Sequence, residues 1–252
     1  MALRVMQRLE AVLTVIDAYT KLPVDNAVVN VGGAFYKAAV WKGRGQYLLT
    51  NSINSDDVRR VIVTAPGYAD AVVTIHKDSG DEYNVSMNYA AGHPMLKTIT
   101  YVCFLVMNKL TEKPMQGVGF SAVIDGKAPA LRVIEDYTAG NNTIKLNAGF
   151  SKSLIMAEFI TGKERLLIDG YDHDNGVYTI ANTIKAAIKS GGFLTPIYNL
   201  ATDGKGRAIL PLDPMFTGGA DEITVKLTGE SIADTTCNIK LSGRENHYKI
   251  FI

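Results

Sequence analysis

The stretch LTVIDAYTKLPVDNAVVNVGG, residues 13–33, carries the pattern that decides the fold. Its apolar positions alternate with other residues on both sides of a break: Leu13, Val15, Val24, Ala27, Val29 and Val31. An apolar residue at every second position is typical of a β-strand with one buried face. Pro23 lies in the break, because proline fixes its own φ and cannot donate a hydrogen bond to a sheet. The stretch therefore predicts two strands joined by a turn.

More strand and turn signals follow as far as residue 75. Gly43 and Gly45 supply the backbone freedom of a tight turn before the apolar run YLL at 47–49. The runs RVIVT at 60–64 and AVVTI at 71–75 lie on either side of an Ala-Pro-Gly-Tyr turn at 65–68. We count about six or seven short strands, the number typical of one β-sandwich.

These strand and turn signals resemble a known family. The chain contains D-x-x-T-x-x-P-V-x-x-A-x-V-x-V, then G-x-G-x-Y, then V-x-A-x-G-Y, at these residues: Asp17, Thr20, Pro23, Val24, Ala27, Val29, Val31, Gly43, Gly45, Tyr47, Val63, Ala65, Gly67 and Tyr68. The pattern is similar to bacterial Ig-like and carboxypeptidase-regulatory-like domains, and it covers roughly the first third of the chain. The resemblance implies spacer, adhesive or assembly modules and no catalytic activity, and fold alone does not fix function.

The opening pattern returns at a constant offset. Its second copy is Asn108, Thr111, Pro114, Met115, Val118, Phe120 and Ala122. Further on, residues 166–171 resemble the strand and Gly-Tyr turn at 61–68, after an insertion around residues 135–142. This predicts a second, divergent sandwich that ends near residue 176.

A third copy is partial. Residues 202–210 repeat the Gly-x-Gly turn and the following strand at Gly204 and Gly206, and residues 221–227 and 236–241 supply a strand pair, but no T-x-x-P opening precedes them. The sequence thus predicts an all-β chain of tandem Ig-like β-sandwich modules with little helix, at residues 1–92, 93–176 and 177–252. Residues 181–190, ANTIKAAIKS, fit either a strand or a short helix capped by Asn182, and both remain open here.

Composition and charge limit the possible partners. With 26 Lys plus Arg against 25 Asp plus Glu, the formal charge is +1, so no duplex nucleic acid is expected as a partner. Cys103 and Cys237 lie far apart in apolar runs, and we expect buried free thiols, with a disulfide bond or a reactive group as the alternative.

The N-terminal residues bear on where the protein acts. Residues 1–17 have Arg4, Arg8 and Glu10 but no uninterrupted apolar run of the roughly 7–15 residues found in secretory leaders. No window approaches the roughly 18 apolar residues of a membrane helix. We therefore expect synthesis in the bacterial cytoplasm and no membrane insertion.

Several features suggest chemistry, and each also has a structural explanation. The acidic cluster around Gly176 resembles a calcium loop but is out of register with an EF-hand, which favours a solvated hairpin turn. Its members are Asp169, Asp172, His173, Asp174 and Asn175. The four histidines are scattered, which argues against a zinc site: His76, His93, His173 and His247. The two Gly-x-Gly turns lack the rest of a phosphate-binding loop. No catalytic, cofactor-binding or metal-binding residue is therefore predicted, and no cofactor.

Aromatic residues give one further possibility. Tyr19, Tyr36, Trp41 and Tyr89 are candidates for a sugar-binding platform, although Trp41 fits a core or edge position better because it directly precedes a turn.

Two functions remain. The first is a structural component of a phage virion or phage-like contractile particle (capsid decoration, collar, tail or baseplate), which acts by docking onto other subunits as a homo-oligomer or hetero-complex. The alternative is an extracellular surface adhesin or carbohydrate-binding module whose partner is a cell-surface glycan. The apolar runs at 102–107 and 154–160 and both chain ends, 1–15 and 248–252, are candidate docking segments. For the two runs, ordinary inner strands of a large core are the alternative.

Overall fold

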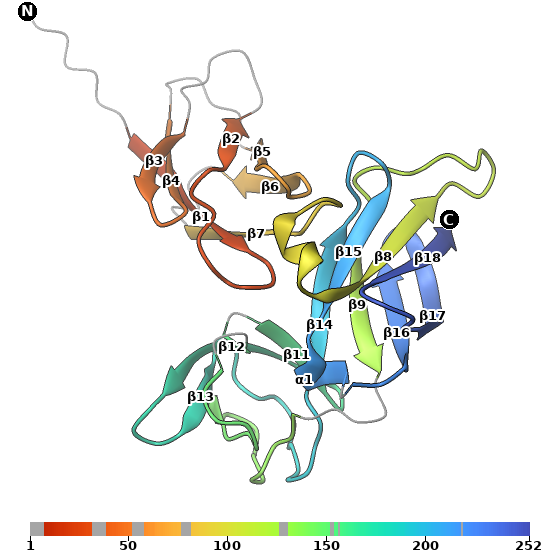
Figure 1. Ribbon diagram of the computed structural model, residues 1–252. Helices are drawn as coiled ribbons and strands as arrows, with labels where there is room; N and C mark the ends of the chain where they lie inside the picture. Colours follow the sequence, from red (N-terminus) through yellow and green to blue (C-terminus); the bar gives the residue numbers. More distant parts are fainter. Residues whose placement is uncertain are drawn as a thin grey trace, which may run out of the picture. The chain divides into compact units, whose positions relative to one another are not determined.

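The computed structural model describes residues 8–31, 39–51, 58–76, 82–125, 131–151, 154–155, 157–217 and 219–252 (Figure 1). The chain divides into two compact units, residues 1–93 and 94–252, which we call unit 1 and unit 2. The predicted all-β class is confirmed, since the described helices are η1 (Pro94–Lys97) and α1 (Pro214–Thr217), each of four residues. No helix in these residues has the length and apolar character needed to cross a membrane.

Unit 1 is one β-sandwich. Its strands are β1 (Arg8–Asp17), β2 (Val28–Val31), β3 (Val40–Gly43), β4 (Gln46–Asn51), β5 (Val58–Thr64), β6 (Ala71–His76) and β7 (Glu82–Met87). One sheet has the order β3-β4-β1-β7 and the other the order β2-β5-β6. The alternating residues found in the sequence, among them Leu13, Val15, Val29 and Val63, face a common core.

Unit 2 contains more strands and one long sheet. Its strands are β8 (Thr100–Met107), β9 (Gly119–Asp125), β10 (Thr143–Ile144), β11 (Ala157–Thr161), β12 (Glu164–Asp172), β13 (Val177–Ile180), β14 (Thr195–Ala201), β15 (Arg207–Leu212), β16 (Glu222–Gly229), β17 (Ile232–Lys240) and β18 (Glu245–Phe251). The small sheet has the order β15-β8-β18, and the eight-stranded sheet the order β10-β13-β12-β11-β14-β9-β16-β17.

The two units share one strand-pairing scheme. In unit 1, β1 pairs antiparallel with β4 and parallel with β7, while β5 lies between β2 and β6. In unit 2, β8 pairs antiparallel with β15 and parallel with β18, while β16 lies between β9 and β17. The first strand, its two neighbours and the opposing three strands therefore correspond one to one.

The turn after the first strand is the same in both units. In unit 1 the Asp17 carboxylate accepts hydrogen bonds from the backbone N–H groups of Tyr19 and Thr20, both at 2.8 Å. In unit 2 the Asn108 side chain accepts the corresponding bonds from Leu110 and Thr111, at 3.0 and 2.9 Å. The D-x-x-T and N-x-x-T patterns are thus Asx turns, in which a side-chain oxygen closes the chain on itself.

Gly45 and Gly206 also correspond. A Cβ on Gly45 would overlap the carbonyl oxygen of Val15, and a Cβ on Gly206 would lie 2.9 Å from that of Val106. Both glycines have positive φ, 71° and 73°. Gly45 follows Asp17 by 28 residues, whereas Gly206 follows Asn108 by 98, so unit 2 holds 70 additional residues between its second strand and this turn.

Most of these extra residues lie in an insert, residues 126–194, between β9 and β14. The insert has a core of its own, with Phe159, Leu166, Ile168 and Tyr178 fully buried. It is joined to the rest of unit 2 through β14, which pairs with β11 of the insert on one side and with β9 on the other.

The insert changes the predicted module boundaries. The boundary at 176/177 lies in the hairpin between β12 and β13. Residues 195–252, part of the predicted third module, pair with β8 and β9 and complete the second sandwich. This explains why no T-x-x-P opening precedes Gly204, since the opening of this sandwich is the one at residues 108–114.

Both expectations for residues 181–190 differ from the structure, because this segment forms neither a helix nor a strand. Ile184 and Ile188 are buried in the insert core, and the Asn182 side chain accepts a hydrogen bond from Leu167 N and donates one to Arg165 O. These tertiary contacts override the helical spacing.

The predicted docking segments are largely occupied within the chain. Val102, Phe104 and Val106 lie in the core of unit 2 on the central strand β8, and Leu154 and Phe159 lie in the insert core. Residues 248–251 belong to β18, which pairs with β8. Residues 1–7 lie outside the described residues.

Candidate functional site

Three aromatic side chains form a patch at the surface of the insert. Phe150 lies 5.3 Å from Tyr171 and 5.1 Å from His173, measured between ring centroids, and the rings of Tyr171 and His173 are 4.9 Å apart. The Phe150 side chain is 52% exposed. We call Phe150, Tyr171 and His173 the aromatic patch.

A buried tyrosine holds the patch in place. The hydroxyl of Tyr178 donates a hydrogen bond to Gly149 O at 2.8 Å and accepts one from Ser151 N at 2.9 Å. It therefore fixes the backbone on both sides of Phe150. The Tyr178 ring also contacts Tyr171, with centroids 4.7 Å apart. Tyr178 is fully buried, whereas Phe150 is exposed to solvent.

The acidic cluster next to the patch is a hairpin turn. Asp172 Oδ1 accepts hydrogen bonds from the N–H groups of Asp174 and Asn175, and its Oδ2 accepts one from Asn175 Nδ2 at 2.7 Å. The hydrogen bond from the Asn175 side chain is the main cause that lowers the Asp172 pKa. Asp169 accepts a hydrogen bond from the Thr179 hydroxyl at 2.6 Å. The carboxylates of Asp169 and Asp172 therefore both accept hydrogen bonds from residues of this hairpin.

The described residues contain no group of three or more His, Cys, Asp or Glu side chains able to hold a metal ion. His93 instead belongs to a buried cluster in unit 1, where its ring stacks on Tyr89 at 4.0 Å. Burial lowers the pKa of His93.

Tyr68, from the Gly-Tyr turn, donates a hydrogen bond to Asp17 Oδ2 at 2.9 Å, and burial raises the pKa of Tyr68. This hydrogen bond joins the Asx turn at Asp17 to the Gly-Tyr turn at Tyr68, and both turns belong to the motif that resembles bacterial Ig-like domains.

Among the described residues, the aromatic side chains singled out from the sequence do not form an exposed platform. Tyr89 is 3% exposed, and Tyr19 contacts it at 6.1 Å between ring centroids. Trp41 lies on the edge strand β3 and is 55% exposed, so it is an edge residue without a place in the core. Tyr36 lies outside the described residues. No comparable sequence signal marks Phe150, although residues 171 and 178 do bracket a recognisable turn.

Both cysteines are buried free thiols. Burial raises the pKa of Cys103 to about 11 and also raises that of Cys237. A raised pKa keeps a thiol protonated and a poor nucleophile at neutral pH.

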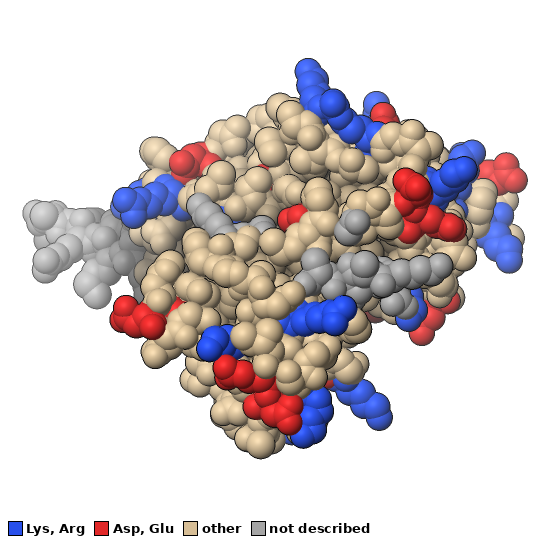
Figure 2. Space-filling view, turned by 60° about the horizontal axis from the view of Figure 1, so that its bottom comes forward, with Lys and Arg blue, Asp and Glu red and all other residues tan. Residues whose placement is uncertain are grey.

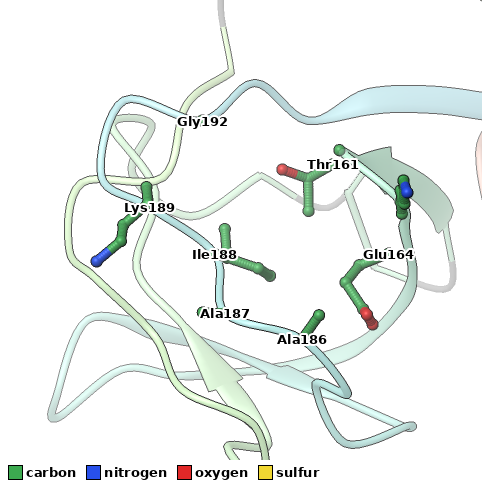
Figure 3. Close-up of a pocket in the computed structure, with 9 residues that line it drawn as sticks. Thr161, Glu164, Ala186, Ala187, Ile188, Lys189 and Gly192 are labelled. Atoms are coloured by element: carbon green, nitrogen blue, oxygen red, sulfur yellow. The ribbon is translucent and has the colours of Figure 1, made fainter.

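A shallow hollow of about 360 Å³ lies between the β11–β12 turn and residues 186–192 of the insert (Figure 3). The Thr161 hydroxyl faces it, Ile188 and two alanines form its apolar part, and Glu164 Oε2 accepts a hydrogen bond from Lys185 N at 3.2 Å. Lys189 points away from it and pairs with Asp136 at 2.8 Å.

Charges of both signs are mixed on the visible surface. On the face drawn in Figure 2, Lys and Arg side chains lie beside Asp and Glu side chains. The ion pair between Lys145 and Glu135, at 3.2 Å, is one example on the insert. We predicted from the charge that duplex nucleic acid is not a partner, and this remains a prediction.

Comparison with known proteins gives fold-level similarity only. No family model and no curated protein matches the chain. Among solved structures it is similar to the Bacillus anthracis TIE protein (10% identity, TM-score 0.27, 97% of this chain and 33% of that one) and to a streptococcal ancillary pilin (11%, 0.28, 96% and 68%). It is also similar to the shaft pilin SpaA from Lactobacillus rhamnosus GG (15%, 0.24, 98% of both chains). The chain spans about a third of the length of the TIE protein. The present chain is an all-β protein of tandem sandwiches, and TM-scores this low carry no conclusion about its activity.

Proposed function

We propose that this chain is a non-enzymatic structural protein of a repeated assembly, in which the two sandwiches act as a scaffold and the insert docks onto a neighbouring subunit. The observation that carries the proposal is the repeated strand pairing of units 1 and 2, with 70 additional residues in unit 2 only. Repetition of one unit is typical of a spacer, and an addition on one copy gives that spacer a distinct surface.

The insert is suited to rigid presentation. It continues the eight-stranded sheet of unit 2 through β14, and Phe216 of α1 packs into its core. Three of its large apolar side chains are exposed: Ile134 at 42%, Phe150 at 52% and Phe193 at 42%. The guanidinium of Arg132 lies 4.5 Å over the Phe193 ring. Aromatic and arginine side chains on a rigid support are typical of docking surfaces.

Deletion of the insert tests this function. Because β9 and β14 are antiparallel neighbours, with Val123 opposite Ile197, residues 126–194 can be replaced by an Asn-Gly turn. Phe216→Ser removes the apolar side chain that the deletion would expose. In the producing cells, we expect the unchanged chain to sediment with high-mass material and the deleted chain to remain monomeric and folded.

The location of that material separates a particle from a cell surface. Phage or phage-like particles are released by lysis, whereas a surface assembly stays with the cell envelope. A chain that is monomeric in every fraction, with or without the insert, would contradict the proposal.

The aromatic patch favours a second function, adhesion to a glycan. Exposed aromatic rings bind the apolar faces of sugars, and Tyr178 forms hydrogen bonds with the backbone on both sides of Phe150. Binding to a glycan array should be lost in Phe150→Ala and kept in the control Phe193→Ala, which removes an equally large exposed ring elsewhere on the insert. Equal loss in both variants would contradict a glycan site at the patch.

A further inference from the structure

The first and last strands of each unit lie side by side and run in the same direction. In unit 1, β1 and β7 form a parallel ladder with six register pairs, from Val12 opposite Glu82 to Asp17 opposite Met87. In unit 2, β8 and β18 form a parallel ladder with seven, from Tyr101 opposite Glu245 to Met107 opposite Phe251.

This arrangement determines how each unit responds to tension along the chain. Tension enters at the N-terminal end of the first strand and leaves at the C-terminal end of the last. Because the two strands are parallel, these ends lie at opposite ends of the ladder, and the strands are pulled past each other. Every backbone hydrogen bond of the ladder then carries load at the same time. An antiparallel pair would have both loaded ends at one edge, and its bonds would break one after another.

The insert lies outside this path. It branches from the chain between β9 and β14, and neither strand belongs to the β8–β18 ladder. Tension therefore passes from β8 to β18 across the small sheet before it reaches residues 126–194.

We propose that both units are tension-bearing elements, with β1–β7 and β8–β18 as parallel clamps that keep the insert unloaded. The proposal deepens the structural role above, but it concerns the isolated chain. Loss of assembly and loss of mechanical resistance are therefore separate results.

Single-molecule force spectroscopy on the full chain tests the proposal. At about 3.3–3.6 Å per extended residue, rupture of unit 1 between residues 12 and 87 should release on the order of 250 Å, and rupture of unit 2 between residues 101 and 251 on the order of 500 Å. We expect no release of the insert before the unit 2 event. A separate early step from residues 126–194 would overturn the unloaded position of the insert.

A second pulling direction tests the clamp without damaging the fold. Leu110 is 92% exposed and follows β8, and Lys109 N donates a hydrogen bond to Ile252 O at 2.7 Å, so residue 110 and the C-terminus lie at the same end of the ladder. A handle on Leu110→Cys, pulled against the C-terminus, peels β18 from β8. The natural thiols are buried and do not compete for the handle.

We expect the unfolding rate of unit 2 at constant force to rise in this direction by more than the roughly fivefold that one lost hydrogen bond gives. Equal rates in the two directions would overturn the proposal.

Proline substitutions locate the loaded bonds. Ile252 N donates to Met107 O at 2.9 Å, and Tyr101 N donates to Arg244 O at 2.8 Å. Bonding groups alternate along a parallel strand, so the N–H of Tyr248 faces β8, whereas that of Lys249 faces the outer edge, which is unpaired in the described residues.

Relative to Tyr248→Ala, the variant Tyr248→Pro should unfold about fivefold faster at constant force, the equivalent of about 1 kcal/mol for one bond. Lys249→Pro should match the unchanged chain, because proline is tolerated where the N–H faces solvent. If Lys249→Pro weakens unit 2 as much as Tyr248→Pro does, the clamp is not the β8–β18 ladder.

Discussion

The substitution Gly206→Ala should destabilise unit 2 and leave unit 1 unchanged. Gly206 has φ of 73°, and an added Cβ would lie 2.8 Å from Pro114 Cβ and 2.9 Å from both Met115 N and Val106 O. The left-handed conformation costs a residue with a Cβ about 1–2 kcal/mol, and overpacking adds about 1–3 kcal/mol. We therefore expect the free energy of unfolding of unit 2 to fall by about 2–5 kcal/mol.

The two cysteines provide an assay specific to unit 2. Cys103 and Cys237 both lie in this unit and are buried, so labelling of thiols in increasing urea reports its unfolding. With a urea dependence of about 2 kcal/mol per molar, the labelling midpoint should fall by about 1–2.5 M. Trp41, the one tryptophan of the chain, lies in unit 1 and reports that unit separately.

The matched control is Gly204→Ala, because a Cβ there meets no atom within 4 Å. Its labelling midpoint should stay the same or rise slightly, since alanine restricts the unfolded chain more than glycine does. If Gly206→Ala labels at the same urea concentration as the unchanged protein, Gly206 does not pack against the opening turn of unit 2, and the correspondence with Gly45 fails.

Three other expectations concern Cys103, Tyr178 and Asp172. Burial raises the pKa of Cys103 from 9.0 to about 11, so between these pH values the folded chain keeps a proton that the unfolded chain releases. The free energy of unfolding of unit 2 should therefore fall as the pH rises from 9 to 11. The variant Cys103→Ala should reduce this fall. Tyr178→Phe removes the hydroxyl that accepts a hydrogen bond from Ser151 N and donates one to Gly149 O. It should lower the free energy of unfolding by about 1–3 kcal/mol and speed amide hydrogen exchange at Ser151. The control Tyr171→Phe should leave that exchange unchanged. A chelator should leave the thermal midpoint unchanged, because the Asp172 carboxylate accepts its hydrogen bonds from the hairpin itself; a fall of several degrees would show a bound metal.

The sequence alone determined the features that depend on near neighbours in the chain. Alternation at Leu13, Val15 and Val29 reflects the period of a strand, which is a local property, and these residues do face one core. The D-x-x-T and N-x-x-T patterns mark the same Asx turn in both units, because the hydrogen bonds involved span two or three residues. For this reason the all-β class and the start of the second sandwich follow from local sequence patterns.

Only the tertiary structure decided which strands belong together. β9 and β14 are neighbours in a sheet although 69 residues separate them, from 126 to 194, and no local signal encodes a pairing over that distance. The second half of unit 2 therefore resembles a separate third module in the sequence. The aromatic patch has the same origin, since Phe150 contacts Tyr171 only in the folded chain, where the buried Tyr178 hydroxyl bonds both neighbours of Phe150. At residues 181–190, burial of Ile184 and Ile188 outweighed a weak helical preference, because core contacts gain more free energy than a few residues of helix propensity.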